Sequence, residues 1–318
     1  MISNLPALID EASQRWGLTN VEPVPNLSYN FVAFAGRGER TSRHDTDDHK
    51  DSGRGDPAPT RDVVLKIGVP RDELTSEIAA LCLFNGDGAC QLVDADEEKG
   101  FLLLERLKPG VMLSTLEDDE KAILIAAEVM KKIWRTSAVP DSPRKEHAER
   151  PDQQRDSSKF LKLSDWFDGL NRLRAMFDGG TGPLDEKLVE RVERSVKDFL
   201  AENHMPVLMH GDLHHFNILS SERGWLVIDP KGVIGPAGYE VGPLMINPWG
   251  SLSDGISNRL LLRRVDILHE HLGWERERIL EWCLAHGILS AWWGIEDNTG
   301  WEYAMDFSRM IANLPLLS

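Results

Sequence analysis

The chain contains residues 210–217, His-Gly-Asp-Leu-His-His-Phe-Asn, and twelve residues later an aspartate within residues 226–232, Leu-Val-Ile-Asp-Pro-Lys-Gly. Asp212, an asparagine five residues further on, and Asp229 follow one another in the order that kinases use for phosphoryl transfer. Asp212 would accept or orient the proton of an acceptor hydroxyl, and Asn217 and Asp229 would hold Mg²⁺ through oxygen atoms. Mg²⁺ also keeps waters and phosphate oxygens as ligands, so two protein ligands suffice.

Three histidines in the same segment allow a rival interpretation. His210, His214 and His215 could join Asp212 as the metal ligands of a hydrolase. That interpretation leaves Asn217, the second aspartate and an upstream lysine without a role. We therefore expect His210, which directly precedes the catalytic turn, to hydrogen-bond the loop rather than to act as an acid or base.

The upstream lysine is Lys66, in the apolar residues 63–68, Val-Val-Leu-Lys-Ile-Gly. A lysine inside an apolar strand either points to solvent or reaches an anion. Together with the downstream motif, this strand matches the V-A-I-K pattern, whose lysine contacts the α- and β-phosphates of a nucleotide. Glu77 lies at the edge of the apolar stripe of the following helix and is the expected partner of Lys66. Glu73 is the competing partner, but the helix dipole already stabilises it in the first turn.

The charge balance narrows the class of ligand. The 318 residues include 36 basic and 52 acidic side chains, a formal net charge of −16. This excess argues against a nucleic-acid partner, which favours a basic face. An acidic site would concentrate a small cationic substrate, although acidity that serves only solubility explains the same composition.

The sequence gives no indication of export or of a membrane span. Residues 1–6 lack the basic start and apolar run of a signal peptide. No stretch approaches the roughly 18 apolar residues that a membrane helix needs. Cys82, Cys90 and Cys283 show no C-x-x-C spacing, so we expect reduced thiols. We expect a cytoplasmic protein without membrane partners that acts as a monomer.

The first hundred residues alternate short strands and helices. Residues 31–35 and 62–69 are predicted as neighbouring strands, because they are β-branched or aromatic and bounded by turn formers. Residues 72–85 carry apolar side chains at helical spacing, and Gly86 is expected at the helix end. Residues 101–105 form a predicted buried strand, and the Pro-Gly break after it marks a boundary between two lobes.

A polar segment, residues 36–61, separates the first two strands. It has almost no apolar side chains, so it cannot bury enough surface to order itself, and we expect a mobile insertion. A solvated loop is the preferred interpretation, although five of its residues could be taken as a metal cluster: His44, Asp45, Asp47, Asp48 and His49.

The rest of the chain is predicted to be mainly helical. Residues 116–134 and 184–203 carry helical periodicity, and the polar residues 140–159 link helices as a second insertion. A strand pair around residues 205–209 and 225–229 brackets the catalytic loop, and tryptophan-rich helices end the chain. A strand-rich lobe followed by a helical lobe places a ligand site between the two.

These features together resemble the kinase-like antibiotic phosphotransferases. The downstream residues 239–242, Tyr-Glu-Val-Gly, and 247–249, Asn-Pro-Trp, are similar to the aminoglycoside/hydroxyurea antibiotic resistance kinase family, a streptomycin 6-phosphotransferase-like branch. The resemblance covers the chain from about residue 20 to the C-terminus and is most specific over residues 210–249.

The resemblance implies an α+β, two-lobed protein-kinase-like fold. Its small N-terminal lobe, residues 1–107, would carry an antiparallel sheet and bind the nucleotide, with residues 36–61 as an insertion. Its C-terminal lobe, residues 108–318, would be mainly helical and hold the catalytic and acceptor-binding groups. The implied cofactors are ATP, with GTP left open, and Mg²⁺.

Two departures separate the chain from protein kinases. The phosphate-binding G-x-G-x-x-G is absent, and residues 26–30, Asn-Leu-Ser-Tyr-Asn, stand in its place. Their amides and the Ser28 hydroxyl would have to cover the phosphates. Residues 229–232, Asp-Pro-Lys-Gly, replace D-F-G, and no A-P-E follows. The second departure argues against activation-loop regulation and against a protein substrate.

The remaining site residues rest on the resemblance. Backbone groups of the linker from Glu105 to Leu107 would pair with the adenine. The carboxylates of the acceptor pocket would pair with ammonium or guanidinium groups, and an indole would offer a cation–π contact. These acceptor residues are Glu240, Asn247, Trp293, Glu296 and Asp297. The tryptophans 292 and 293 also fit a core, and the two acids 296 and 297 also fit an exposed helix end.

The sequence therefore predicts an enzyme that moves the γ-phosphate of ATP to a hydroxyl of a small cationic molecule. The resemblance implies streptomycin, at its 6-hydroxyl, as the acceptor. A kinase of another small hydroxylated metabolite, a sugar or a cyclitol, is the alternative. A nucleotide-binding pseudokinase regulator is a further alternative, against which the retention of the complete catalytic set argues: Lys66, Glu77, Asp212, Asn217 and Asp229.

Overall fold

The three-dimensional structure is a computed structural model of the chain. It describes residues 4–24, 30–38, 60–136, 157–202, 205–248 and 258–315. Residues 39–59, which include the five possible metal ligands between residues 44 and 49, lie outside the described residues, and so does Ser28.

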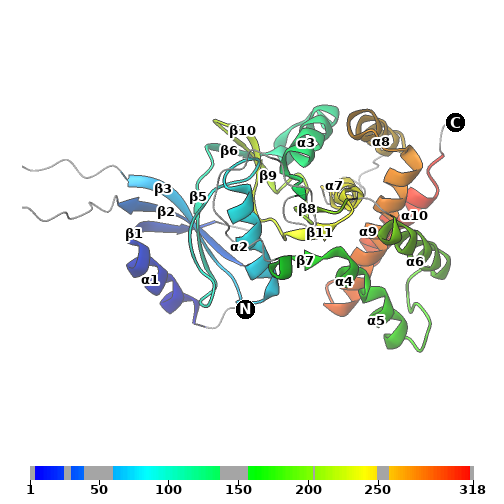
Figure 1. Ribbon diagram of the computed structural model, residues 1–318, viewed down its shortest axis with the longest axis horizontal. Coiled ribbons are helices and arrows are strands. Elements are labelled where there is room, and N and C mark those ends of the chain that lie inside the picture. The colour runs from blue at the N-terminus through cyan, green and yellow to red at the C-terminus, as the bar shows by residue number, and fades with distance from the viewer. Residues whose placement is uncertain are drawn as a thin grey trace, which may run out of the picture.

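An antiparallel sheet of five strands forms the first part of the chain, in the order β1-β2-β3-β5-β4 (Figure 1). The strands are β1 Leu18–Pro23, β2 Phe31–Gly38, β3 Thr60–Ile67, β4 Leu92–Asp96 and β5 Phe101–Glu105. In the β2–β3 pair, Ala33 lies opposite Leu65. The predicted neighbouring strands are therefore confirmed.

The two faces of this sheet bury different partners. Side chains alternate across a strand, so Leu65 and Ile67 point to the same face, where they pack with α1 (Leu5–Trp16). Lys66 must then point to the opposite face, where α2 (Asp72–Phe84) packs. Figure 1 shows α2 between the sheet and the helical part of the chain. The strand period therefore directs Lys66 toward the rest of the protein.

Helix α2 supplies the acidic partner that the sequence predicts. Its buried residues include Leu74, Glu77 and Leu81, so the glutamate belongs to the buried stripe itself and not only to its edge. The helix ends at Asn85, whose φ of 46° is left-handed, one residue before the expected Gly86. Asparagine tolerates this conformation better than most residues, so it can replace glycine as a helix cap.

Two small sheets of three strands each flank the catalytic loop. One sheet has the order β10-β9-β6 and the other has the order β7-β11-β8. Their strands are β6 Pro109–Met112, β7 Leu161–Lys162, β8 Val207–Met209, β9 Ile218–Ser221, β10 Gly224–Val227 and β11 Val233–Gly235. The two strands that the sequence predicts to bracket the loop, β8 and β10, thus belong to different sheets. The expectation that they form one pair was wrong, because each finds its partner elsewhere in the chain.

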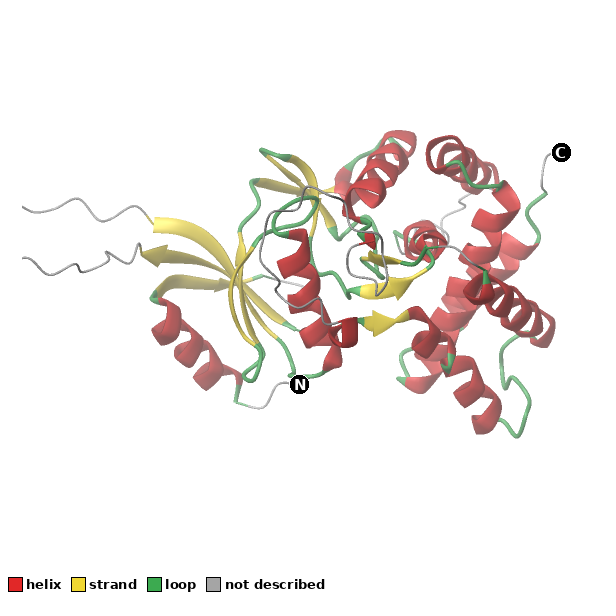
Figure 2. Cartoon of the chain, in the orientation of Figure 1, coloured by secondary structure: helices red, strands yellow, loops and turns green. Residues whose placement is uncertain are grey.

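The rest of the described chain is mainly helical (Figure 2). The helices are α3 Asp119–Ile133, α4 Leu163–Phe167, α5 Gly169–Met176, α6 Glu186–Ala201, α7 Val241–Ile246, α8 Asn258–Leu272, α9 Arg276–Glu296 and α10 Glu302–Ala312. Helices α3 and α6 confirm the two segments of predicted periodicity. Helix α9 packs against α6, α7, α8 and α10 and is buried over most of its length, with Trp282 and Trp292 in the core.

Two expectations from composition can be compared with the structure. Within the described ranges, no helix combines the length and the apolar character that crossing a bilayer requires. All three cysteines are free thiols, with Cys90 and Cys283 buried and Cys82 exposed.

Candidate active site

The catalytic loop runs from the end of β8 to the start of β9. Gly211 has a φ of +86°, and a Cβ atom there would lie 2.5 Å from Cγ2 of Val233. Only glycine therefore fits directly before Asp212. The backbone N–H groups of His210 and Gly211 both donate to the carboxylate of Glu240, over 2.8 and 2.9 Å. A side chain from outside the loop thus fixes the loop backbone.

His210 ties the loop to the strand that precedes Asp229. Its Nε2 lies 2.8 Å from the carbonyl oxygen of Ile228, and its Nδ1 accepts the N–H of Asp212 over 3.2 Å. Burial lowers the pKa of His210 to about 4, so the neutral ring carries its proton on Nε2. Both ring nitrogens are occupied by the backbone, which confirms the expected structural role.

Asp212 and Asn217 lie together at the surface of the loop. The Asp212 side chain is 40% exposed, so a substrate can reach it. The Asn217 amide nitrogen donates to the backbone carbonyl of Asp212 over 3.0 Å. This bond turns the amide oxygen of Asn217 away from the loop backbone, where it is available to a metal ion. His214 is adjacent, with Nε2 at 3.8 Å from Oδ1 of Asp212.

Lys66, Glu77 and Asp229 form a charge cluster between the sheet and the catalytic loop, in which Lys66 and Glu77 are buried and the Asp229 side chain is 41% exposed. The Lys66 ammonium donates to both carboxylate oxygens of Glu77, at 2.6 and 2.7 Å, and also to Asp229. The predicted Lys66–Glu77 pair is therefore present, and Glu73 is not the ion-pair partner of Lys66. This cluster joins the strand that carries Lys66 to the residue that follows the catalytic loop, 163 residues later.

The electrostatics of this cluster favour the charged form of the lysine. Burial alone would lower the pKa of Lys66, but Glu77 and Asp229 together raise it above its ordinary value. Burial raises the pKa of Glu77, and Lys66 partly offsets this effect. Burial would likewise raise the pKa of Asp229, yet Lys66 and Lys231 hold it below its ordinary value. Asp229 is thus kept as a carboxylate, the form that binds metal.

The donor set fits Mg²⁺ and not a multi-histidine metal site. Asn217 and Asp229 offer an amide oxygen and a carboxylate, both hard ligands of the kind that Mg²⁺ prefers. No group of three or more His, Cys, Asp or Glu side chains within the described parts of the chain is arranged to hold a metal ion. His210 is occupied by the backbone, and His215 is buried with a pKa lowered to about 4 by burial. These observations contradict the rival hydrolase interpretation.

The linker after β5 is held in place by side chains. The Glu105 carboxylate accepts the N–H of Gln91 over 3.0 Å and pairs with Arg223. Leu107 is buried in the main core. The Arg106 guanidinium lies 3.9 Å from the ring centroid of Phe34 on β2. Both predicted linker side chains therefore hold the linker backbone in place.

Two predicted acceptor residues lie elsewhere than expected. Glu240 is fully buried, and its two oxygens accept the loop N–H groups described above. Asn247 is also buried. Its side-chain amide donates to the backbone carbonyl of Pro243 over 2.9 Å, and its backbone carbonyl accepts a hydrogen bond from Arg264. Both side chains are buried and hydrogen-bonded to backbone groups, so the assignment of both to the acceptor pocket is corrected to support of the surrounding backbone.

The other predicted acceptor residues lie at the end of α9. Trp293 is half-buried and stands perpendicular to Trp166, with ring centroids 5.4 Å apart. Glu296 forms an ion pair with Arg172, and Asp297 is exposed just after the helix. Trp166 also lies close to the catalytic loop: a Cβ atom built on Gly211 would lie 3.1 Å from Cη2 of the Trp166 indole. The half-exposed indole corner of Trp166 and Trp293 therefore borders the catalytic loop.

Sequence patterns did not single out Trp166 or the role of Lys231. Trp166 follows a long polar segment and lies in a helix of five residues, too short to show periodicity. Lys231 was visible only as a departure from D-F-G.

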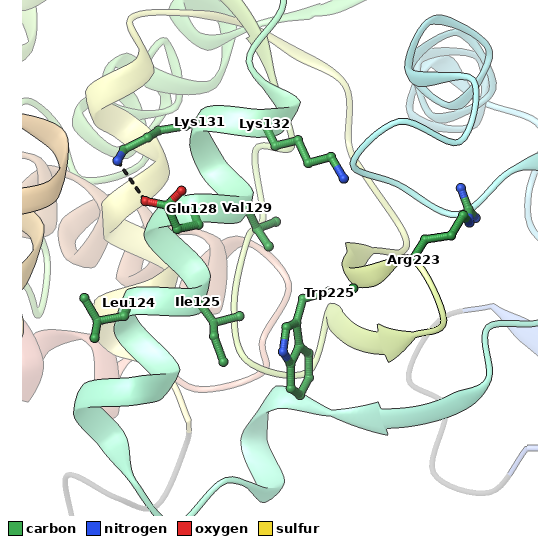
Figure 3. A pocket seen from close by; sticks show the side chains of 9 residues that line it. Leu124, Ile125, Glu128, Val129, Lys131, Lys132, Arg223 and Trp225 are labelled. Atoms are coloured by element: carbon green, nitrogen blue, oxygen red, sulfur yellow. Dashed lines mark hydrogen bonds and ion pairs between the residues drawn. The ribbon is translucent and has the colours of Figure 1, made fainter.

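A separate surface hollow of about 610 Å³ lies between α3 and β10 (Figure 3). Leu124, Ile125, Val129 and Trp225 form its apolar part, and Lys132 and Arg223 border it. None of the predicted site residues lines this hollow, so it is not part of the candidate active site.

Comparison with known proteins gives one family. The family model described as aminoglycoside/hydroxyurea antibiotic resistance kinase matches residues 51–298, more than half of the chain. Streptomycin 6-kinase from Streptomyces griseus is 28% identical over 93% of this chain and 85% of its own length. Hydroxyurea phosphotransferase from Kitasatospora aureofaciens is 27% identical over 93% of this chain and 75% of its own length.

Solved structures show the same fold. A thermostable mutant of aminoglycoside phosphotransferase APH(4)-Ia, in a ternary complex with ADP and hygromycin B, matches with a TM-score of 0.59.

The match with APH(4)-Ia covers 97% of this chain and 99% of the solved chain. At 12% identity this likeness shows the fold alone. The fold is kinase-like, with an antiparallel sheet in the N-terminal part and a helical C-terminal part, as the sequence predicts.

Proposed function

The chain belongs to the aminoglycoside/hydroxyurea antibiotic resistance kinase family, whose members are ATP-dependent small-molecule kinases, and on that premise we propose that its acceptor is a small hydroxylated cation, with streptomycin first. The observation that carries the proposal is the contact of Lys66 with both Glu77 and Asp229 beside the exposed Asp212. This contact brings together a phosphate-binding cation, a metal-binding carboxylate and an acceptor-binding carboxylate in one site.

The proposed reaction assigns a role to each residue of this site. The acceptor oxygen forms a bond to the γ-phosphorus while the bond to the β–γ bridging oxygen breaks and its electron pair stays on ADP. Asp212 orients the acceptor hydroxyl and takes its proton. Lys66, held by Glu77, binds the inner phosphates. Asn217 and Asp229 would hold Mg²⁺, which neutralises the phosphate charge when bound.

The nucleotide would lie between the sheet and the catalytic loop. We assign its adenine to backbone groups of the linker from Glu105 to Leu107, whose side chains are turned to support the linker. The Ser28 hydroxyl, outside the described residues, remains our proposal for covering the phosphates. ATP is the proposed donor, and GTP belongs in the same test.

A cationic acceptor is supported by the groups that surround the catalytic aspartate. Trp166 and Trp293 offer two perpendicular indole faces, the geometry that can hold an ammonium or guanidinium group by cation–π attraction. Glu296 and Asp297 add carboxylates at the end of the same helix. Streptomycin, phosphorylated at its 6-hydroxyl, is the best single proposal, because the relatives at 28% identity include streptomycin 6-kinases.

Other acceptors remain distinct outcomes of the same test. A relative at 27% identity is named for hydroxyurea, a neutral molecule that would not use the indole corner as a cation site. A sugar or cyclitol kinase is the second alternative. A pseudokinase regulator is disfavoured, because the phosphate-binding lysine and its glutamate are paired as in an active kinase. We further propose that the enzyme works as a cytoplasmic monomer, with no nucleic-acid partner.

The deciding experiment is an ATP-consumption assay with a panel of acceptors. Streptomycin, hydroxyurea, a neutral cyclitol and a sugar should be compared, with mass spectrometry of the product to locate the phosphate. We expect magnesium-dependent consumption with streptomycin and a product with one added phosphate. Consumption with the cyclitol alone would exclude the cationic acceptor, and no transfer to any acceptor would favour the pseudokinase.

The indole corner gives the panel a matched pair of variants. Trp293→Ala should raise the KM for streptomycin at least about tenfold and leave the KM for ATP within about twofold, since a cation–π contact in a partly desolvated site is worth roughly 1–2 kcal/mol. Trp274→Ala, which removes a half-buried indole stacked on Trp134, is the control. Equal effects of the two variants on the streptomycin KM would remove Trp293 from the acceptor site.

A further inference from the structure

Lys231 is held beside the catalytic loop by its backbone. Its N–H donates to the carbonyl of His210 over 2.8 Å, and the next residue, Gly232, donates to the same carbonyl over 3.2 Å. The carbonyl of Gly232 in turn accepts the hydroxyl of Ser76 on α2 over 2.7 Å. A Cβ at Gly232 would lie 2.6 Å from the Ser76 carbonyl oxygen, so the turn is packed tightly against α2. The backbone on which Lys231 stands is therefore fixed on two sides.

The side chain of Lys231 is half-buried and lies among the charges of the site. Three carboxylates act on it, those of Asp229, Asp212 and Glu73, and the ammonium of Lys66 opposes them. Its Nζ nevertheless forms no hydrogen bond or ion pair with any residue in the described ranges. A cation that is drawn toward the two catalytic aspartates and has no fixed partner is available to an anionic ligand.

The other cation of the site is already engaged. Lys66 donates to both oxygens of Glu77 and to Asp229, and it enters from the sheet. Lys231 instead stands on the turn whose backbone is bonded to His210 of the catalytic loop. During phosphoryl transfer, charge spreads over the three equatorial oxygens of the transferring group, and catalysis depends on cations and donors placed around them. Among the described residues, Lys231 is thus a cation of this site that has no hydrogen-bond or ion-pair partner of its own.

We propose that Lys231 is a catalytic residue whose ammonium binds the non-bridging oxygens of the γ-phosphoryl group while it moves to the acceptor. The inference rests on the proposed function, because it assumes that this site transfers phosphate. Lys231 stays protonated throughout and only donates hydrogen bonds. The bond between the γ-phosphorus and the bridging oxygen breaks, the bond to the acceptor oxygen forms, and the acceptor proton goes to Asp212.

A transition-state mimic separates this role from simple charge balance. Lys231→Met keeps the length of the side chain and removes its charge. Calorimetry should measure the binding of ADP and Mg²⁺ to the full chain, with and without aluminium fluoride, which mimics the transferring phosphoryl group. We expect the variant to bind ADP within about threefold of the unsubstituted chain and to lose at least tenfold of the extra affinity that aluminium fluoride confers, on the scale of removing one donor.

The control is Lys197→Met, which removes an exposed lysine on α6, a helix that packs against α9. Equal tightening by aluminium fluoride in both variants would overturn the proposal, and so would a complete loss of ADP binding in Lys231→Met. If aluminium fluoride does not tighten ADP binding to the unsubstituted chain, the rates of ATP hydrolysis without acceptor are compared between Lys231→Met and Lys197→Met. Equal rates would overturn the proposal. Neither readout includes streptomycin, so a wrong acceptor and a wrong role for Lys231 are distinguishable.

Discussion

Glu240 accepts the backbone N–H of Gly211 over 2.9 Å, directly before the catalytic Asp212. The second oxygen of the same carboxylate accepts the N–H of His210 over 2.8 Å. The carboxylate is fully buried, 29 residues further along the chain than the glycine that it holds. The direction in which Asp212 leaves the backbone therefore depends on a side chain that cannot reach the substrate.

Glu240 should make the free energy of unfolding of the protein fall as the pH rises from about 4.5 to about 7. Burial raises the pKa of Glu240 from 4.5 to about 7. The folded state thus holds this proton more tightly than the unfolded state, and the stabilisation is present below pH 4.5 and lost between about 4.5 and 7. The linked change in the free energy of unfolding is on the order of 3 kcal/mol.

Urea unfolding of the unsubstituted chain and of Glu240→Gln, at pH 5 and at pH 8, measures this change. Glutamine does not titrate, so the unfolding free energy of the unsubstituted chain should fall relative to that of Glu240→Gln as the pH rises from 5 to 8. Parallel pH profiles for Glu240→Gln and its parent would mean that Glu240 does not titrate with folding.

The Lys66–Glu77 pair should matter more for stability than an exposed ion pair. Glu77→Ala leaves a buried ammonium with Asp229 as its remaining partner, and breaking a buried pair in this way costs about 3 kcal/mol. Lys66→Met combined with Glu77→Leu should regain most of that stability, because the only charge that loses its partner is Asp229, whose side chain is 41% exposed. The free energy of unfolding from denaturant titration checks both values.

The matched control for this prediction is Glu128→Ala, which breaks the exposed Lys131–Glu128 pair shown in Figure 3. Exposed pairs contribute about 1 kcal/mol or less. A loss of stability in Glu77→Ala no larger than in the control would show that the buried pair is not stabilising. Nucleotide binding should fall in the double variant even where stability returns.

The parts of the site that sequence could predict are local in the chain. The strand period places Lys66 on the face opposite Leu65, and helical spacing places Glu77 on the buried stripe of the next helix, eleven residues away. Asp212 and Asn217 lie in one loop, so their spacing already constrains their geometry. Short-range periodicity and fixed loop spacing are sufficient for these residues.

The parts that sequence could not predict depend on contacts between distant segments. The sequence shows that Glu240 is acidic, but not that both its oxygens meet the loop backbone. Likewise, the sequence does not show that Asn247 forms hydrogen bonds with Pro243 and Arg264. The strands on either side of the loop were expected to pair, but strand partners are chosen by the whole fold. Burial and partner choice are properties of the packed chain, so a motif alone does not separate a supporting residue from one that contacts the substrate.

Asp212→Ala should slow phosphoryl transfer by at least about 100-fold, the usual scale for removal of a general base. Nucleotide binding should stay nearly intact, because Asp212 is exposed on the loop and makes no ion pair with Lys66. Steady-state turnover with the active acceptor and calorimetric ADP binding together test this prediction. A variant with near-normal turnover would remove Asp212 from the reaction.

Asp229→Ala should remove the effect of magnesium on nucleotide binding. The carboxylate is the one charged ligand in the proposed metal set, and its pKa is held below its ordinary value, so it is ionised at neutral pH. Calorimetry with ATP in the presence of Mg²⁺ or of EDTA measures the coupling. In the variant the two affinities should converge, and an unchanged ratio would exclude Asp229 as a metal ligand. Asp297→Ala, at an exposed helix end, is the control.

Replacing residues 39–59 with Asn-Gly should leave activity within about twofold of the full chain. Gly38 and Thr60 are paired at the ends of β2 and β3, so the two strands can be closed by a two-residue turn, for which Asn-Gly is the favoured sequence. Shortening a connection also lowers the entropy cost of closing it, so the thermal midpoint should not fall. Turnover and the KM values for ATP and acceptor should be measured on both proteins. A rise in the acceptor KM alone would assign the replaced segment to acceptor binding, and a rise in the ATP KM alone would assign it to the nucleotide site.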